Sequence, residues 1–504
     1  MLKKNDLIIV VIGSLLYTVL FHKNPLGINF LIFELFVVSC LLLFQHVKIK
    51  GAALIISLAG ILITAFATVL VFSVWSYFVN FIVFLLFIGC LIFPEIKSFF
   101  HAFILFFYSI FFAPVLFIRN LSESRFKNKK IGIYFKKIRI FLIPLIIIFI
   151  FILIYRSSNP LFDNMLTSIG DFLNDILIKI FGRLDLTFII TLIIGLFFCS
   201  VIFLRSPYIG AIENYKKKND VFKRIKIRIK RKFPLLALKN EYKAGIFLFL
   251  ILNLILLTVN IIDINWVWFN FEWNGSYLKQ FVYTGTYLLI LSIIISVVLV
   301  LYYFRGNLNF YKNNRLLSYL SYIWLAQNAI LAISVGIRNF WYIYYFSLAY
   351  GRIGVYMFLA LTLYGLYSVY IKVRYQKSAF YLIRHNAFSL IIVLVLSSVF
   401  NWDCIIAKYN FSNYNRSFVH LNYLSSLAPK ALPYLDKSLK ELNNIDSIQK
   451  RKFDYEYSYM SPEEYYSKIE RKKEKFKLKW ESKGFLSWNL PEYRAYEELF
   501  GKKK

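Results

Sequence analysis

The stretch VYTGTYLLILSIIISVVLVLYYF, residues 282–304, carries no charged side chain, and IFLIPLIIIFIFILIY, residues 140–155, is equally apolar. A membrane-spanning helix needs about 20 consecutive apolar residues, and such runs recur as far as residue 406. Lipid offers the backbone no hydrogen-bond partners, and these runs do not alternate as barrel strands do. The sequence therefore predicts an all-α integral membrane protein.

The composition agrees with this fold class. Of 504 residues, 59% are hydrophobic and 17% are charged, with a mean hydropathy of +0.60. The net charge of +33 would point to nucleic acid in a soluble protein, but most cations lie in loops between apolar runs, which is typical of the positive-inside bias. We expect membrane lipids as partners and no nucleic acid, because the basic runs match no binding module.

We predict about 12 transmembrane helices followed by a small helical, extracytoplasmic C-terminal segment. The spans fall at about residues 7–22, 27–45, 52–72, 76–94, 99–118, 139–155, 186–204, 244–262, 282–304, 316–336, 352–371 and 388–406. Three parts follow: N-terminal hydrophobic helices (1–118), a membrane domain with basic loops (119–407) and a soluble helical tail (408–504).

Loop charges predict the orientation. The basic loops at 119–139 and 205–243 are expected in the cytoplasm of a bacterium, with the protein in its inner membrane. Counting the predicted spans from these two loops places the C-terminal tail outside the cytoplasmic membrane. Five spans before the first loop would also place Lys3 and Lys4 outside. Either the N-terminus is external, or one of the first five segments does not cross. A separate alternative is that the closely joined segments 52–72 and 76–94 form a re-entrant hairpin.

The tail contains a clear helix start. In Ser461-Pro462-Glu463-Glu464, a hydroxyl cap precedes a proline at the first helical position and two carboxylates near the positive end of the helix dipole. A charged helix is predicted from there to about Lys483, and aromatic side chains such as Trp480 and Trp488 give it an apolar surface for packing.

Familiar catalytic patterns are missing from the sequence. The five histidines form no metal-ligand spacing, and the four cysteines form no C-x-x-C pair. Neither a Walker loop nor G-x-S-x-G occurs. We therefore expect no metal and no cofactor, and we lean against an enzyme without excluding one.

Polar residues within apolar spans are the better indication of function. An ionisable group in hydrocarbon costs about 2.5–3.5 kcal/mol on insertion scales, so it tends to face a cavity or a partner. Interhelical hydrogen bonds are the alternative role, particularly for amides. We expect Asp403 to pair with a cation, most simply Arg352. The candidate intramembrane polar cluster comprises Glu34, Gln327, Asn328, Arg352, Asn401 and Asp403, with Asn410 close to the last two.

Short motifs carry a family resemblance. They are Leu348-Ala349-Tyr350, Arg352-Ile353-Gly354-Val355, Gly365-Leu366, Asn401-Trp402-Asp403 with Asn410, Asn159-Pro160-x-Phe162, and Tyr423-Leu424-x-x-Leu427 before Pro433. Together they resemble the bacterial membrane family called domain of unknown function 4173, over about residues 140–436. Trp402 stands where that family has a proline, and the turn around Gly351 matches loosely. The resemblance implies a multi-pass fold with an external tail and no established activity.

Three function classes follow from the sequence. We favour a non-enzymatic envelope or regulatory protein that acts through its tail or loops, with a protein partner on the tail. A transporter or flippase-like carrier would use Glu34, Arg352 and Asp403 around an intramembrane cavity. A membrane-embedded enzyme would act on lipid or polyprenyl substrates. The positions of these three side chains in space would distinguish the classes.

Overall fold

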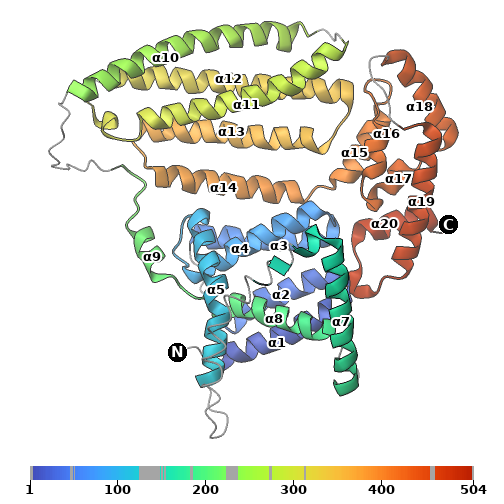
Figure 1. Ribbon diagram of the computed structural model, residues 1–504. Helices are drawn as coiled ribbons and strands as arrows, with labels where there is room; N and C mark the ends of the chain where they lie inside the picture. Colours follow the sequence, from blue (N-terminus) through green and yellow to red (C-terminus); the bar gives the residue numbers. More distant parts are fainter. Residues whose placement is uncertain are drawn as a thin grey trace. The chain divides into compact units, whose positions relative to one another are not determined.

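The computed structural model describes residues 4–45, 49, 51–123, 148, 151–152, 155–181, 186–222, 236–271, 275–311, 314–453 and 460–501 (Figure 1). Within these ranges every named element is a helix. The chain forms two compact units. Unit 1 is Met1–Lys217 with Lys483–Leu490, and unit 2 is Lys218–Ser482 with Pro491–Lys504.

The all-helical, membrane-like architecture is confirmed, whereas the count of spans is not. Within the described ranges, eight helices are long and apolar enough to cross a membrane. Three further apolar helices, of 10–17 residues, correspond to predicted spans but are shorter than that length. The predicted span at 139–155 lies mostly outside the described residues. The eight are Ala52–Leu70, Val74–Ile92, Phe99–Phe117, Leu186–Leu204, Leu238–Phe269, Arg315–Phe346, Tyr350–Arg374 and Ala379–Ser398.

Unit 1 is built mainly from apolar helices. Its elements are α1 (Lys4–Phe21), α2 (Ile28–Leu43), α3 (Ala52–Leu70), α4 (Val74–Ile92), α5 (Phe99–Glu123), α7 (Pro160–Phe181), α8 (Leu186–Leu204), α9 (Ile209–Lys216) and η4 (Phe485–Ser487). The α1 helix packs on α8, and α4 packs on both α3 and α5. A Cβ at Gly89 would lie 2.1 Å from the Ala102 carbonyl oxygen, so glycine lets α4 and α5 approach closely.

Residues 483–490 pack into unit 1 although they lie near the end of the chain. The Ile28 amide donates to the Trp488 carbonyl at 2.9 Å, and the Ser487 hydroxyl donates to the Pro25 carbonyl at 3.0 Å. The Trp488 ring packs against a small apolar cluster of α2 and α3 formed by Leu31, Ala65 and Val69. This segment therefore closes one end of α2.

Unit 2 contains a bundle of long helices that lie side by side (Figure 1). They are α10 (Leu236–Asp263) with the π-helical turn η1 (Ile264–Phe269), α11 (Gly275–Tyr303), η2 (Asn307–Phe310), α12 (Arg315–Phe346), α13 (Tyr350–Arg374) and α14 (Ala379–Ser398). The α12 helix contacts α10, α11 and α13, and its buried apolar side chains, such as Leu317 and Val335, form the core with theirs.

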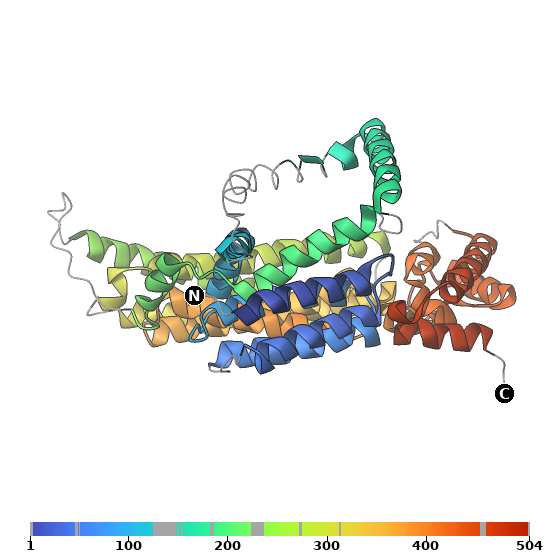
Figure 2. The same cartoon turned by 90° about the horizontal axis from the view of Figure 1, so that it is seen from below.

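The C-terminal helices of unit 2 gather at one end of this bundle, where Figure 2 shows them in orange to red. They are α15 (Trp402–Ser412), α16 (Leu421–Ser426), η3 (Pro429–Ala431), α17 (Leu432–Leu435), α18 (Leu439–Lys452), α19 (Pro462–Glu481) and α20 (Leu490–Phe500). Ser461 and Glu464 form a reciprocal capping box on α19, which confirms the helix predicted from that motif. Tyr465 and Ile469 of this helix enter a separate apolar core.

The last predicted span, 388–406, is wrong in its bounds. The α14 helix ends at Ser398, and a new helix begins at Trp402 after non-helical backbone at Asn401. The Trp402 indole N–H donates to the Ser397 carbonyl at 2.8 Å and so satisfies the end of α14. Asp403 consequently belongs to the C-terminal helices and not to a membrane span.

Candidate functional site

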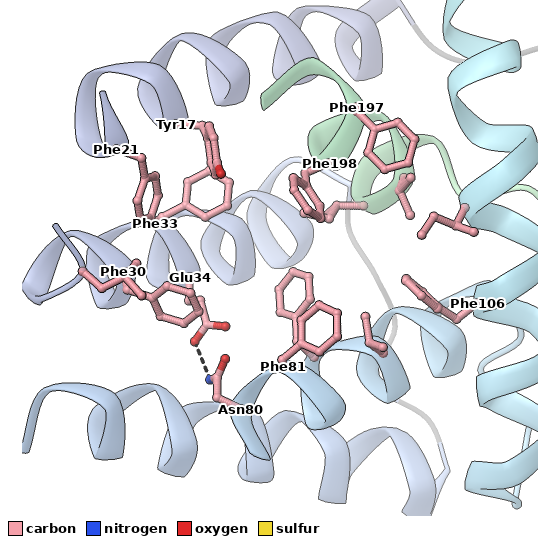
Figure 3. Close-up of a pocket in the computed structure, with 16 residues that line it drawn as sticks. Tyr17, Phe21, Phe30, Phe33, Glu34, Asn80, Phe81, Phe106, Phe197 and Phe198 are labelled. Atoms are coloured by element: carbon pink, nitrogen blue, oxygen red, sulfur yellow. Dashed lines mark hydrogen bonds between the residues drawn. The ribbon is translucent and has the colours of Figure 1, made fainter. Parts of the chain in front are cut away.

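A pocket of about 190 Å³ lies among five helices of unit 1 (Figure 3). Its lining residues come from α1, α2, α4, α5 and α8 and from the turn before α2, and most of them are aromatic or aliphatic. Rings such as Tyr17, Phe33 and Phe81 face the space in the close-up. Because these helices are apolar throughout, any polar group in this wall is conspicuous.

Glu34 and Asn80 are the polar pair of this pocket. The Asn80 amide donates to Glu34 Oε2 at 2.9 Å, drawn as the dashed line in Figure 3, and to the Thr64 hydroxyl at 3.2 Å. Thr64 in turn donates to the Gly60 carbonyl at 2.8 Å within its own helix. Glu34 is 4% exposed, and the Asn80 carbonyl oxygen is buried without a hydrogen-bond partner among the described residues. Such an orphaned buried acceptor calls for an explanation.

A second polar cluster lies in unit 2, at the turn between α12 and α13. Ser347 adopts a φ of 72°, which ends α12 and turns the chain. The Arg352 guanidinium donates to the carbonyls of Phe346 and Ser347, and it stacks 4.3 Å above the ring of Tyr342. It thereby satisfies carbonyls that the helix end would leave without partners.

The C-terminal helices hold this turn from their side. Asn410 accepts from the Leu348 amide at 2.7 Å and donates to its carbonyl at 3.0 Å. The Ser347 hydroxyl donates to the Phe418 carbonyl at 2.7 Å, and the Phe418 amide donates to the Tyr345 carbonyl at 2.8 Å. These bonds are buried or half-buried, so they fasten the C-terminal helices to the end of the bundle.

Asp403 forms its ion pair with Lys430 and not with Arg352 as expected. Lys430 Nζ lies 3.2 Å from Asp403 Oδ2, and the two side chains are 1% and 9% exposed. The Ala428 amide donates to the other carboxylate oxygen at 3.3 Å. Arg352 is instead used on the carbonyls of the turn. Asp403 is thus paired with a cation, and the partner is one that the sequence reading overlooked.

Burial shifts the pKa values of several ionisable groups around Asp403. It lowers the pKa of Lys430, and the charge of Asp403 partly offsets that effect. Burial also lowers the pKa of Lys472, whose ammonium donates to the carbonyls of Ser425, at 3.0 Å, and Leu427. Cys404 beside them has its thiol pKa raised by burial to about 11. The amines of Lys430 and Lys472 and the carboxylate of Asp403 therefore lie in one region that is largely shielded from water.

The remaining predicted residues lie elsewhere in unit 2. Gln327 donates to the side chain of Asn253 at 3.1 Å and so links α12 to α10, whereas Asn328 donates to the Trp324 carbonyl at 2.8 Å within α12 itself. Asn401 stands at the start of α15. The contacts of Gln327 and Asn328 thus form a group distinct from those of Arg352 and Asp403.

Several functional candidates were missed by the sequence reading. Asn80 satisfies the same criterion as Glu34, a polar side chain in an apolar span, and could have been found by it. Asp263 forms a buried ion pair with Arg338 and could have been found in the same way. Lys430 had no such signal, because it lies in a short Pro-Lys-Ala turn that resembles an exposed loop.

The comparisons with known proteins bear on the same regions. A family model described as a domain of unknown function (DUF4153) matches residues 35–438. The chain belongs to this family. The resemblance to domain of unknown function 4173 is not confirmed, because the DUF4153 model is the one that matches. No curated protein and no solved structure matches the chain.

The DUF4153 match reaches both polar clusters. It includes Asn80 as well as the turn at Ser347 and the Asp403–Lys430 pair, and it ends before α18. Glu34 immediately precedes its first residue. The family description names no function, so the chemistry of these clusters is the available guide to one.

Proposed function

We propose that this chain is a non-enzymatic integral membrane protein that presents its C-terminal domain to a protein partner at the membrane surface. The C-terminal domain is residues 402–482 and 491–501 of unit 2. The single observation that carries the proposal is the fastened turn between α12 and α13. A tail without a role in positioning would need only a flexible linker, whereas this one is held by buried polar bonds.

The contacts between the C-terminal helices and the turn that joins α12 to α13, here called the junction, support a fixed orientation of the C-terminal domain. Hydrogen bonds of Asn410 and Phe418 hold the turn from one side, and Arg352 holds it from the other. The buried pair of Asp403 and Lys430 fixes α15 against η3. Buried polar networks of this kind specify one geometry, because any shift leaves charges unpaired.

The distribution of polar residues supports the envelope or regulatory role over the carrier alternative. A carrier would use Glu34, Arg352 and Asp403 around one cavity that also contains Gln327 or Asn328. In unit 2, Gln327 and Asn328 make helix–helix or helix-internal hydrogen bonds, whereas Arg352 and Asp403 belong to the junction. The amide N–H groups of Gln327 and Asn328 are thus used within the helix bundle, and the charged groups of Arg352 and Asp403 are used at the C-terminal helices, which is the arrangement expected of interhelical hydrogen bonding.

The proposal places the protein in a bacterial inner membrane with the C-terminal domain on the outer face. The support is that an even number of predicted spans separates the two basic loops, so both lie on the same side of the membrane, which positive charge identifies as the cytoplasmic side. An impermeant maleimide should label Ser467→Cys in intact spheroplasts and label Lys217→Cys only after lysis; both parent side chains are exposed. The reverse pattern would overturn the orientation. Cys40, Cys90 and Cys199 are buried, so Cys404→Ala gives a suitable background.

The partner is tested by photocrosslinking in living cells. A photoreactive amino acid at the exposed positions Glu474 and Lys475 of α19 should give protein adducts of defined size. The matched control is Leu396, an exposed apolar residue of α14, which should give lipid adducts. Lipid adducts alone at all three positions would contradict the proposal. An adduct at Leu396 identical to those of α19 would place the partner on the bundle instead.

A further inference from the structure

The hydrogen bonds around Asn80 leave a specific vacancy in the pocket of unit 1. Both amide hydrogens of Asn80 are donated, one to Glu34 and one to Thr64. Its carbonyl oxygen accepts nothing from the described residues, although it is buried. Among the described residues, Asn80 is the donor to the Glu34 carboxylate. With Glu34 ionised, the pair therefore offers only acceptors to the space.

Charge complementarity is missing at the same place. The residues that line the pocket include no lysine, arginine or histidine, and no described cation forms an ion pair with Glu34. Asp403, Asp263 and Asp220 of unit 2 each have such a partner. A buried carboxylate without a cation is costly, so such a group either takes up a proton or receives its counter-charge from a ligand. The walls add aromatic faces, which attract cations.

The size of the pocket limits the ligand. A cavity of about 150 Å³ is known to hold benzene, so about 190 Å³ has room for roughly eight non-hydrogen atoms. Leu26, Phe81 and Phe198 line the pocket and are 45%, 49% and 39% exposed, so the pocket is not sealed and we place its entrance beside them. These residues are apolar, so the entrance selects for a hydrophobic body.

We propose that this pocket binds a small hydrophobic primary amine in its ammonium form. The ammonium group donates to the Glu34 carboxylate and to the Asn80 carbonyl oxygen, and its hydrocarbon part lies among the phenyl rings. A primary ammonium has enough N–H donors to reach both acceptors at once, and its positive charge neutralises the Glu34 carboxylate. An alcohol of the same shape has one donor and no charge, so it satisfies only one acceptor.

Benzylammonium and benzyl alcohol make a matched pair of probes, because each has eight non-hydrogen atoms. Binding is measured by calorimetry on the full chain in lipid nanodiscs, with empty nanodiscs subtracted for membrane partitioning. We expect benzylammonium to bind at least 10-fold more tightly than benzyl alcohol. Equal affinities in the unaltered protein would overturn the proposal, and this comparison needs no variant to fold.

Variants then locate the site. Glu34→Gln should remove the preference for the amine, and Glu34→Asp should retain part of it, because the charge is kept. The matched control is Asp6→Asn, the same change in α1 of unit 1 at a carboxylate that accepts from Gln45 and does not line the pocket. Binding unchanged in Glu34→Gln, or lost equally in Asp6→Asn, would contradict the assignment.

Discussion

Replacing one member of the Asp403–Lys430 pair should loosen the C-terminal domain. The Lys430 side chain is 1% exposed, and its Nζ lies 3.2 Å from the carboxylate. Lys430→Met leaves the carboxylate buried with the Ala428 amide still donating to it at 3.3 Å. Asp403→Asn leaves the ammonium buried beside a neutral amide. Each change therefore strands a charge in a dehydrated site.

The expected cost follows from this geometry. Removing one partner of a buried pair typically costs about 3–5 kcal/mol, whereas replacing both by apolar groups is often neutral. The lowered pKa of Lys430 makes it easier for that amine to lose its proton once Asp403 is gone. We therefore expect Asp403→Asn at the lower end, near ~3 kcal/mol, and the double change Asp403→Leu with Lys430→Met to recover most of the loss.

Hydrogen exchange of the amides in α16 and α19 measures this effect in the intact protein. A loss of ~3 kcal/mol corresponds to exchange about 150-fold faster, since each ~1.36 kcal/mol is tenfold. The matched control is Lys450→Met, which breaks the exposed pair of Lys450 with Asp446 and should leave exchange nearly unchanged. Equal effects of Lys430→Met and Lys450→Met, or simple additivity in the double variant, would refute the reasoning.

Two further predictions concern single positions. Because burial raises the pKa of the Cys404 thiol from 9.0 to about 11, its thiolate fraction at neutral pH should be about 100-fold lower than normal, and maleimide should react correspondingly slowly, as a timed labelling experiment would show. A Cβ at Gly27 would meet the Ser487 backbone at 2.4 Å, whereas one at Gly484 meets nothing within 4 Å. Gly27→Ala should therefore expose residues 483–490 to protease and Gly484→Ala should not; equal cleavage would contradict the packing.

Local signals in the sequence predicted local structure well. Long apolar runs became helices, and the Ser461 motif became a capped helix start, because both depend on neighbouring residues alone. The break between two helices at Asn401 was missed, because apolar residues such as Ile405 and Ile406 follow it and make the apolar run look continuous. The position of residues 483–490 had no local signal at all. It depends on Trp488 meeting side chains more than 400 residues earlier in the chain.

The partners of polar residues were hardest to predict. Arg352 was the expected partner of Asp403 because both stood near the ends of apolar runs. It was not available, because the end of α12 needed donors for its carbonyls, and the Arg352 guanidinium supplies them. Lys430 took its place from a turn 27 residues beyond Asp403. Sequence spacing cannot rank two such cations, since packing decides which one reaches the carboxylate.

Two of the buried acids, Asp403 and Glu34, thus differ in a way that composition alone does not reveal. Asp403 has a lysine, an amide and surrounding helices that fold around it, so its charge is met within the chain. Glu34 has one amide donor, a cavity at its side and aromatic walls. Asp263 and Asp403, two other buried carboxylates of the described residues, each have a cation partner, and the chain has cations to spare, with 60 Lys and Arg against 27 Asp and Glu. Leaving Glu34 beside an open pocket is then best explained by a cation that arrives from outside.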